Sequence, residues 1–158
     1  MSILVKDAIA ENSQSFVKVY SYAYRMIAAV TFANRFSGVL LMIVANNMDE
    51  NNEFEFGVGE IDKALDIREP STRTKALNVL RLSRLVEIVY DNRTSRYKIR
   101  VNTKAYLRST KKRKPNKNKT FCEDLDFDIL DSKGFIKQSA IDGYKVHDSR
   151  QVKSGGAV

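Results

Sequence analysis

The chain has 158 residues, of which 43% are hydrophobic, and its formal net charge at pH 7 is +8. This length and composition suit one globular domain with its own core and some additional arms. No apolar run reaches the roughly 18 to 20 residues of a membrane span, and MSILVKDAIAEN at the N-terminus lacks the pattern of a signal peptide. The single cysteine excludes an internal disulfide, so we expect a cytoplasmic protein that does not enter a membrane.

The positive charge is concentrated in one part of the sequence. Residues 68–120 hold seventeen basic and three acidic side chains, whereas residues 36–67 hold one basic and seven acidic ones. Residues 1–35 and 121–158 differ from neutrality by only two charges each, positive and negative respectively. This uneven distribution of charge is typical of a protein that binds a polyanion, although a solvated basic surface would give the same pattern.

The first third of the chain predicts one extended segment, two helices and a strand. Residues 16–24 are rich in β-branched and aromatic side chains, which favours a strand or an extended arm. Apolar residues then recur at a helical spacing over residues 24–33. Ser37 is a good N-cap for a largely buried helix, which should end at the polar residues 46–52. The alternating EFEF at residues 53–56 indicates a short strand.

Two further helices are expected next, joined by a turn. Residues 58–65 form a short helix with one apolar side, and residues 66–70 form the turn. Pro70 suits the first turn of a helix, where its missing N–H costs nothing. The second helix should cover residues 71–83. Its buried side should consist of Ala76, Leu77 and Leu80.

Two strands, residues 85–90 and 96–101, should then pair around a hairpin turn at residues 91–95. The order of helix, strand, helix, turn, helix, strand, turn and strand is that of a winged helix-turn-helix, with the hairpin as its wing. We therefore predict an α+β fold in which residues 36–108 form a winged helix-turn-helix DNA-binding domain. Residues 1–35 would form an N-terminal arm and helix.

The rest of the chain has a different composition. Residues 109–120 form a polar linker without apolar periodicity, and six of the nine residues at 111–119 are Lys or Arg. Residues 121–158 form an acidic and apolar C-terminal tail. Three alternatives remain open for the tail: it is disordered, it docks back onto the domain, or it binds a partner.

The helix at residues 71–83 directs hydroxyl, amide and cationic groups outward, which are the types that bond base edges and phosphates. An ordinary amphipathic surface helix is the alternative. A helical wheel places Arg73 toward the core. Two alternatives are open for it: its charge reaches solvent along the helix edge, or the helix begins irregularly. The candidate DNA-binding residues in and before this helix are Arg68, Ser71, Thr72, Arg73, Thr74, Lys75, Asn78 and Arg81.

The hairpin and the linker add basic side chains that would contact phosphates or an adjacent minor groove without reading sequence. In the alternative, the hairpin charges only face solvent and discourage edge pairing, and the linker charges only increase solubility. The candidates in these segments are Arg93, Thr94, Arg96 and Lys98 in the hairpin and Lys111, Lys112, Arg113 and Lys114 in the linker.

The sequence has no catalytic constellation. The only histidine, His147, and the only cysteine, Cys122, are too few for a structural zinc site, and no phosphate-binding GxxxxGK[ST] motif is present. Asp124, Asp126 and Asp128 have the spacing of a calcium loop but lack its glycine and terminal glutamate. We therefore expect no enzyme activity, no cofactor and no metal.

Five segments of the sequence resemble segments of a known family. FVKVY, SGVLLMIVANNMDENNEFEF, the pair IDKALDI and STRTKALNVL, and YKIRVN resemble the RepL-like winged-helix replication proteins of bacterial plasmids, over residues 16–108. The resemblance implies sequence-specific binding to double-stranded plasmid origin DNA and recruitment of host replication proteins, for which residues 121–136 would serve.

Without the resemblance, the residue pattern predicts only that a winged helix binds double-stranded DNA. It leaves open a replication initiator of a plasmid or mobile element, a transcriptional regulator that contacts host transcription proteins, and a winged-helix protein-interaction module. A homodimer through the aromatic residues 16–24 is also left open.

Overall fold

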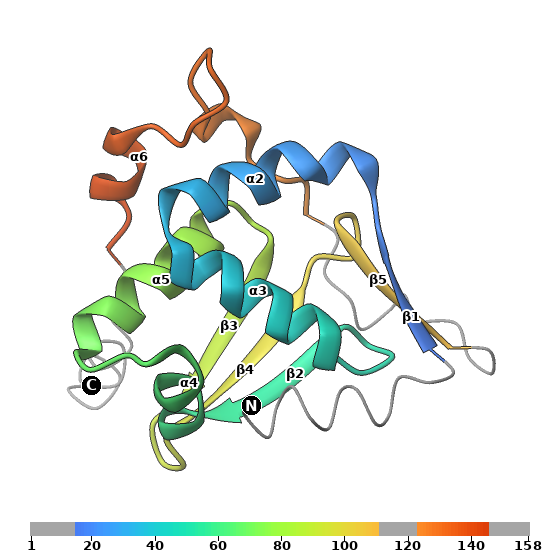
Figure 1. Cartoon of the computed structure of the whole chain (residues 1–158), viewed down its shortest axis with the longest axis vertical. Coiled ribbons are helices and arrows are strands. Elements are labelled where there is room, and N and C mark those ends of the chain that lie inside the picture. The colour runs from blue at the N-terminus through green and yellow to red at the C-terminus, as the bar shows by residue number, and fades with distance from the viewer. Residues whose placement is uncertain (1–14, 111–122, 146–158) are drawn as a thin grey trace, which may run out of the picture.

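The computed structural model describes residues 15–110 and 123–145 of the chain. Helices cover one face of a small three-stranded antiparallel sheet, and a two-stranded ribbon stands at one end of the molecule (Figure 1). The α+β class expected from the sequence is thus confirmed. Within the described residues, no helix is both long enough and apolar enough to cross a membrane.

The helical layer begins with α2 (Tyr24–Ala33) and α3 (Arg35–Asn47), which meet at Asn34. Asn34 is the N-cap of α3, and its Oδ1 accepts a hydrogen bond from the backbone N–H of Ser37 at 3.1 Å. The prediction of Ser37 as the N-cap is wrong, because α3 begins earlier at an extended residue with a capping amide. Ser37 is instead buried, and its hydroxyl donates to the carbonyl of Ala76 at 2.7 Å.

The three-stranded sheet consists of β2 (Glu53–Gly57), β4 (Arg96–Val101) and β3 (Val86–Asp91), in that spatial order. Between β2 and β3 the chain forms α4 (Val58–Leu65) and α5 (Pro70–Leu82). These bounds lie within one residue of those predicted from the sequence.

The hairpin between β3 and β4 turns without a glycine. Ser95 adopts a positive φ of 52° there, a conformation that only a few per cent of non-glycine residues adopt. Asp91 supports the turn, because its Oδ1 accepts a hydrogen bond from the backbone N–H of Arg93 at 2.9 Å.

The core fills the space between the helices and the inner face of the sheet. Leu41 of α3, Ile61 of α4, Leu77 of α5 and Ile99 of β4 are each at most 1% exposed. Residues on β4 alternate strictly between this core and the outer face, as expected for an antiparallel sheet covered on one side. The opposite face of the sheet therefore presents the polar side chains of β4.

The two-stranded ribbon joins distant parts of the sequence. β1 (Ser15–Val19) pairs antiparallel with β5 (Tyr106–Thr110), so that Val17 lies opposite Arg108. The sequence predicts an N-terminal arm at the β1 residues and a linker that begins at residue 109, where the chain becomes polar and basic. The arm and the end of the predicted domain are in fact one hydrogen-bonded unit.

Asn52 and Arg108 connect this ribbon to the rest of the fold. Asn52 is fully buried with a positive φ of 59°, and its side chain donates to the carbonyls of Val101 and Tyr106 at 3.2 and 2.8 Å. Its Oδ1 accepts from the backbone N–H of Arg108 at 3.1 Å. The buried guanidinium of Arg108 donates to carbonyls at the C-terminal end of α3 and to its C-cap residue. Its acceptors are the carbonyl oxygens of Ala45, Asn46 and Met48.

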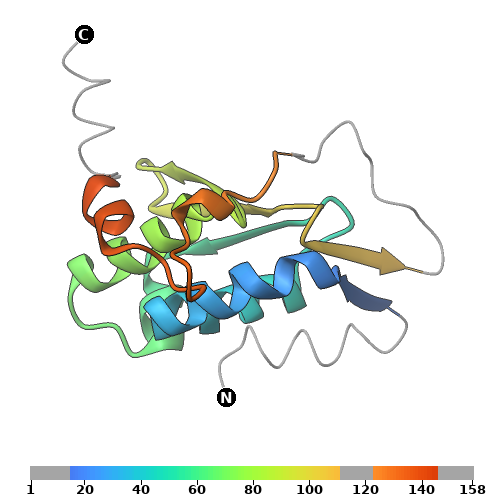
Figure 2. The same cartoon turned by 90° about the horizontal axis from the view of Figure 1, so that it is seen from above.

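The described part of the tail folds back onto the domain. It contains a 3-10 turn, η4 (Phe127–Ile129), and a short helix, α6 (Gln138–Gly143), which lies at the end of the molecule opposite the ribbon (Figures 1 and 2). Its buried side chains are Leu125, Ile129, Leu130 and Ile136. Of the three alternatives for the tail, docking onto the domain is therefore the one that residues 123–145 adopt.

Replacing Arg108 with methionine should lower the free energy of unfolding by about 3 kcal/mol, because buried carbonyls would lose hydrogen bonds from a charged donor. Urea denaturation measures this loss. Arg93→Met removes the same charge from an exposed turn and should change stability by no more than about 0.5 kcal/mol. Equal denaturation midpoints for the two variants would contradict a structural role for Arg108.

Candidate nucleic-acid interface

α5 presents two chemically different sides. Its buried side consists of Ala76, Leu77, Val79 and Leu80, each at most 4% exposed. Pro70 occupies the first helical position, where no N–H is needed. The buried side and the position of the proline are as predicted from the sequence, so the polar residues between them must face away from the core.

The outward side of α5 gathers most of the predicted DNA-binding residues in one place. The exposed members are Arg68, just before the helix, and Ser71 and Lys75 within it. The half-buried members are Thr72, Thr74, Asn78 and Arg81. Asn78 and Arg81 are held together by a hydrogen bond of 3.1 Å from the guanidinium to the amide oxygen. This surface therefore offers hydroxyl, amide and cationic donors on one helix, as base and phosphate contacts require.

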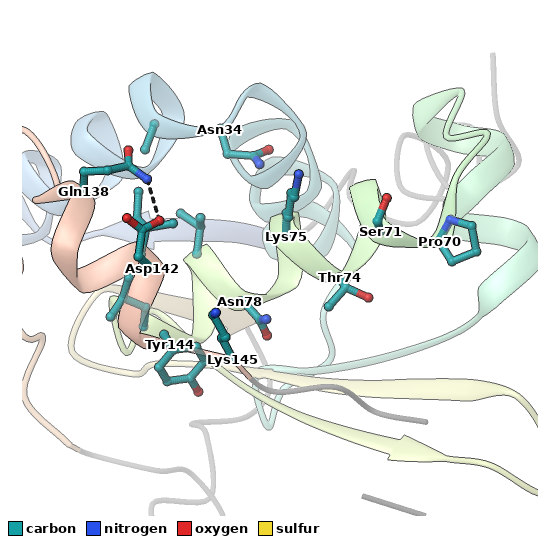
Figure 3. A pocket seen from close by; sticks show the side chains of 14 residues that line it. Asn34, Pro70, Ser71, Thr74, Lys75, Asn78, Gln138, Asp142, Tyr144 and Lys145 are labelled. Carbon is teal, nitrogen blue, oxygen red and sulfur yellow. Dashed lines mark hydrogen bonds between the residues drawn. The ribbon is translucent and has the colours of Figure 1, made fainter. Parts of the chain in front are cut away.

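A cavity of about 810 Å³ lies along this outward side, between α5 and α6 (Figure 3). The polar side chains that line it from α5 are Ser71, Thr74, Lys75 and Asn78. Those that line it from the C-terminal segment are Gln138, Asp142, Tyr144 and Lys145. This second wall was not predicted from the sequence, because residues 138–145 carry no motif and their position depends on the docking of the tail.

Arg73 does not belong to this outward surface. Its Nη1 forms an ion pair with Oδ2 of Asp62 on α4 at 2.5 Å, and its side chain is only 14% exposed. Burial alone would lower the pKa of Arg73, but its bonds to Asp62 and Tyr97 outweigh this and raise the pKa. The helical wheel therefore predicted the direction of the Arg73 side chain correctly, whereas its positive charge suggested a contact with DNA. In the structure, Arg73 joins α5 to α4.

The tip of the β3–β4 hairpin remains accessible. Arg93 and Thr94 are both exposed in the turn. Within the described residues, Arg93 and the outward Lys75 and Arg68 form no ion pair. These three predicted DNA-binding residues are therefore exposed cations that no described acid neutralises.

The basic residues in the body of the hairpin are not free in this way. Arg96 forms ion pairs with Glu55 and Glu60 at 3.3 and 3.4 Å, and Lys98 forms one with Glu53 at 3.0 Å. These acids lie on or beside β2, which is hydrogen-bonded to β4. The predicted basic ribbon is thus largely neutralised by the neighbouring strand, and Arg96 and Lys98 are weaker candidates than Arg93.

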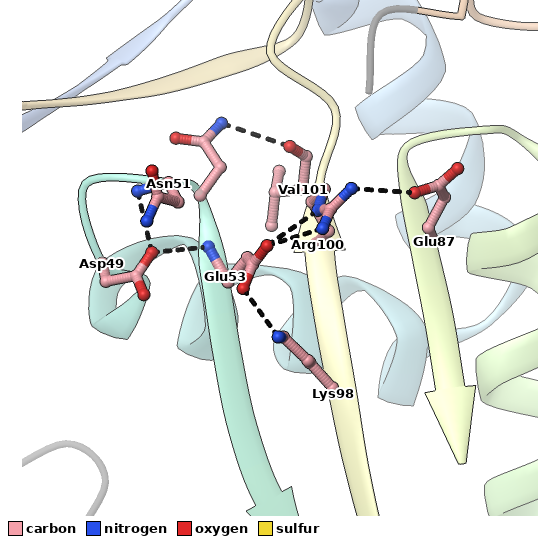
Figure 4. Close-up of polar contacts among 8 residues, drawn as sticks. Asp49, Asn51, Glu53, Glu87, Lys98, Arg100 and Val101 are labelled. Atoms are coloured by element: carbon pink, nitrogen blue, oxygen red, sulfur yellow. Dashed lines mark hydrogen bonds and ion pairs between the residues drawn. The ribbon is translucent and has the colours of Figure 1, made fainter. Parts of the chain in front are cut away.

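Glu53 is the centre of this charge network (Figure 4). It accepts hydrogen bonds from Arg100 at 2.7 and 3.0 Å in addition to its pair with Lys98, and Arg100 also reaches Glu87 on β3 at 3.8 Å. Partial burial pushes the pKa of Glu53 upward, but the hydrogen bonds from Lys98 and Arg100 outweigh it. The pKa of Glu53 is therefore lower than its ordinary value of 4.5.

The remaining candidates fall beyond the described residues. Lys111, Lys112, Arg113 and Lys114 belong to residues 111–122, which lie outside the described ranges, as do Cys122 and His147. Their predicted phosphate contacts stay predictions. In the described ranges, no group of three or more His, Cys, Asp and Glu side chains is arranged to hold a metal ion.

Comparison of the chain with protein-family models, with curated proteins and with solved structures found no match.

Replacing Asp62 should show how much its ion pair with Arg73 stabilises the fold. Asp62→Ala leaves the Arg73 guanidinium without its counter-charge, so the free energy of unfolding should fall by about 2 kcal/mol. The double variant Asp62→Leu, Arg73→Met should recover much of this loss, because Asp62 Oδ1 and Arg73 Nε are already buried without a hydrogen-bond partner among the described residues. Urea denaturation of both chains decides this, and a double variant as unstable as the single one would exclude coupling.

The lowered pKa of Glu53 predicts a pH-dependent contribution to stability. A carboxylate whose pKa is lower in the folded chain stabilises the fold above its unfolded pKa, and this contribution is lost as the pH falls through the folded value. The difference in stability between the natural chain and Glu53→Gln should therefore shrink as the pH falls from about 5 to about 3.

Thermal melts across this pH range measure the effect of Glu53. Glu69→Gln removes the same charge from an exposed residue and is the matched control. A constant difference between the natural chain and Glu53→Gln at all pH values would show that the Glu53 network does not depend on its ionisation.

Proposed function

We propose that this chain is a winged helix-turn-helix protein that binds double-stranded DNA with sequence preference. The observation that supports the proposal is that a chain with the element order of a winged helix also has a polar and cationic surface on α5. The elements α3, β2, α4, α5, β3 and β4 follow each other along the chain in the order of that motif. In the sheet order β2-β4-β3, the hairpin supplies the central strand and one edge strand. The helix in the recognition position, α5, is the one with the polar and cationic outward side.

In this proposal α5 enters the major groove, which is about 12 Å wide and admits one helix. Lys75 and Asn78 occupy the middle of its outward side, and Ser71 and Thr74 precede them by one turn. Amide and ammonium groups form directed hydrogen bonds with purine edges, so Lys75 and Asn78 would discriminate between base pairs. Arg68 and the hydroxyls of the first turn would contact phosphates and fix the register.

The β3–β4 hairpin would act as the wing through its tip. Arg93 and Thr94 would contact the backbone or the adjacent minor groove, whereas Arg96 and Lys98 would keep β2 and β4 together. The residues Lys111, Lys112, Arg113 and Lys114 would add phosphate contacts that do not depend on sequence. Affinity would then come from several segments, and specificity chiefly from α5.

The biological role we favour is replication initiation on a plasmid or a mobile element. This choice rests on the resemblance of residues 16–108 to RepL-like replication proteins, while a transcriptional regulator would use the same contacts with DNA. The two roles differ in where the cognate site lies, at an origin or at a promoter. Host replication or transcription proteins are the partners that each role would require.

A protein-interaction module is the second candidate, and exposed apolar residues favour it. Val39 and Met42 on α3 are 47% and 69% exposed, and Phe32 at the end of α2 is 76% exposed. Apolar side chains of this size on adjacent helices are common in protein interfaces. A homodimer is compatible with either candidate, and Phe16, 60% exposed on β1, is a further residue that it would use.

Titration of the natural chain with DNA tests the proposal. Duplex fragments from around the protein's own gene should include one that binds more tightly than scrambled duplex. Its affinity should fall linearly in the logarithm of the salt concentration, with a slope of about −0.9 for each phosphate contacted. Equal affinity for all duplexes would leave only an electrostatic anchor, and no binding at all would favour the interaction module.

Single substitutions then locate the reading helix. Lys75→Ala should reduce discrimination between cognate and scrambled duplex by about 1 to 3 kcal/mol, because a base contact is lost. Lys63→Ala removes the same charge from the exposed side of α4 and should leave discrimination unchanged. Neutralising Lys111, Lys112, Arg113 and Lys114 together should weaken all duplexes alike. A Lys75→Ala chain that discriminates as well as the natural one would show that α5 is not the reading helix.

A further inference from the structure

The C-terminal segment is held to the domain in two unequal parts. The first part, residues 123–136, is a firm anchor, because Leu125, Ile129, Leu130 and Ile136 are each no more than 9% exposed. Polar bonds add to it. The carbonyl of Glu123 accepts from the side chain of Asn102 at 2.7 Å, and Asp124 pairs with Lys104 at 2.5 Å. This part contributes to the core and cannot leave without exposing it.

The second part, α6, has no fully buried side chain among its six residues. Ala140 and Ile141 are half-buried and are the α6 residues that pack against the core, whereas Ser139 is exposed. The backbone N–H of Lys137 is still bonded to Ile129 at 2.8 Å, so the firm anchor ends where α6 begins. The contacts of α6 are therefore separate from the bonds and buried side chains of the anchor.

α6 lies on the side of α5 that the proposed function assigns to DNA. Tyr144 and Lys145 line the same cavity as Lys75 and Asn78, while Ser71 and Pro70 lie toward its other end (Figure 3). Tyr144 also lines a second concave surface with Arg81, near the last turn of α5. The first turn of α5 is thus open, and the two following turns are flanked by the C-terminal segment.

The major groove of DNA admits one helix but not two packed helices. An α-helix with its side chains is about 10 to 12 Å across, and packed helices lie about 8 to 10 Å apart. The pair α5 and α6 is therefore much wider than the major groove, which is about 12 Å wide. For α5 to bring Asn78 to a base edge, α6 has to leave its place.

We propose that α6 is an autoinhibitory cover over the DNA-reading side of α5, anchored by residues 123–136 and displaced when DNA binds. This inference rests on the proposed DNA-binding function. The affinity of the full chain would be reduced by the fraction of molecules in which α6 is closed. Residues 138–145 contain one acidic and one basic side chain, so the cover acts by occupying space rather than by changing the net charge.

A pair of glutamine substitutions in the full chain tests the cover. Ile141→Gln removes the apolar contact that holds α6 down, and Ser139→Gln places the same side chain on its exposed side as the matched control. Ile141→Gln should bind the cognate duplex about tenfold more tightly than the natural chain, because the open form no longer has to be selected from a small population. Ser139→Gln should bind like the natural chain.

Hydrogen exchange of the natural chain provides a second measurement that needs no variant. Amides of residues 138–145 should exchange faster in the complex with cognate duplex than in the free chain, while those of residues 125–136 keep their protection. Unchanged or slower exchange at residues 138–145 would overturn the cover, because α6 would then remain seated beside bound DNA.

The outcomes separate this inference from the function on which it rests. If the natural chain prefers a cognate duplex but Ile141→Gln binds it equally or more weakly, the cover is wrong and DNA binding stands. If neither the natural chain nor Ile141→Gln prefers any duplex, the DNA-binding function is wrong and the cover is overturned with it.

Discussion

The whole arrangement depends on a buried polar connection between Asn52 and Arg108. A buried amide or guanidinium is costly unless its hydrogen bonds are satisfied, and here they are satisfied by groups from several elements at once. Asn52 joins the start of β2 to the end of β4 and to β5, and Arg108 joins β5 to the last turn of α3. Because the ribbon is fixed to α3 in this way, β1 and α2 are fixed as well, and the helical layer has one position over the sheet.

The cationic surface of this protein can be located only when the pairing of the strands is known. Composition alone suggests that the basic residues between positions 68 and 120 form one cationic surface. The register of β2 with β4 instead places acids beside several of them, and α4 and the tail supply acids to others. The basic residues committed to acidic partners are Arg73, Arg96, Lys98, Arg100 and Lys104. Of the described basic residues between positions 68 and 110, Arg68, Lys75, Arg84 and Arg93 are exposed and form no ion pair within the described ranges. They lie on α5, beside its two ends and at the hairpin tip.

Local elements were predictable from the sequence, and long-range contacts were not. The helix at α4 and the strand at β4 were predicted with the bounds that the structure has, because apolar periodicity and propensity are local signals. β5 was missed because its partner β1 lies at the other end of the sequence and YLRST does not alternate. The outward side of α5 was also predictable, since the wheel follows from its buried residues. Its second wall was not, because nothing in residues 138–145 indicates where the docked tail will place them.

The described part of the tail packs against the domain in two different ways. Its apolar residues Leu125, Ile129, Leu130 and Ile136 extend the core, and the amide of Asn102 bonds both the Arg84 carbonyl and the tail. Its last described helix lies beside the polar side of α5 and buries nothing completely. If α6 were needed for stability as the anchor is, its side chains would be expected to be buried as well. The abrupt change from four buried side chains to none, at the point where the chain reaches α5, is instead what a movable segment on a fixed anchor requires.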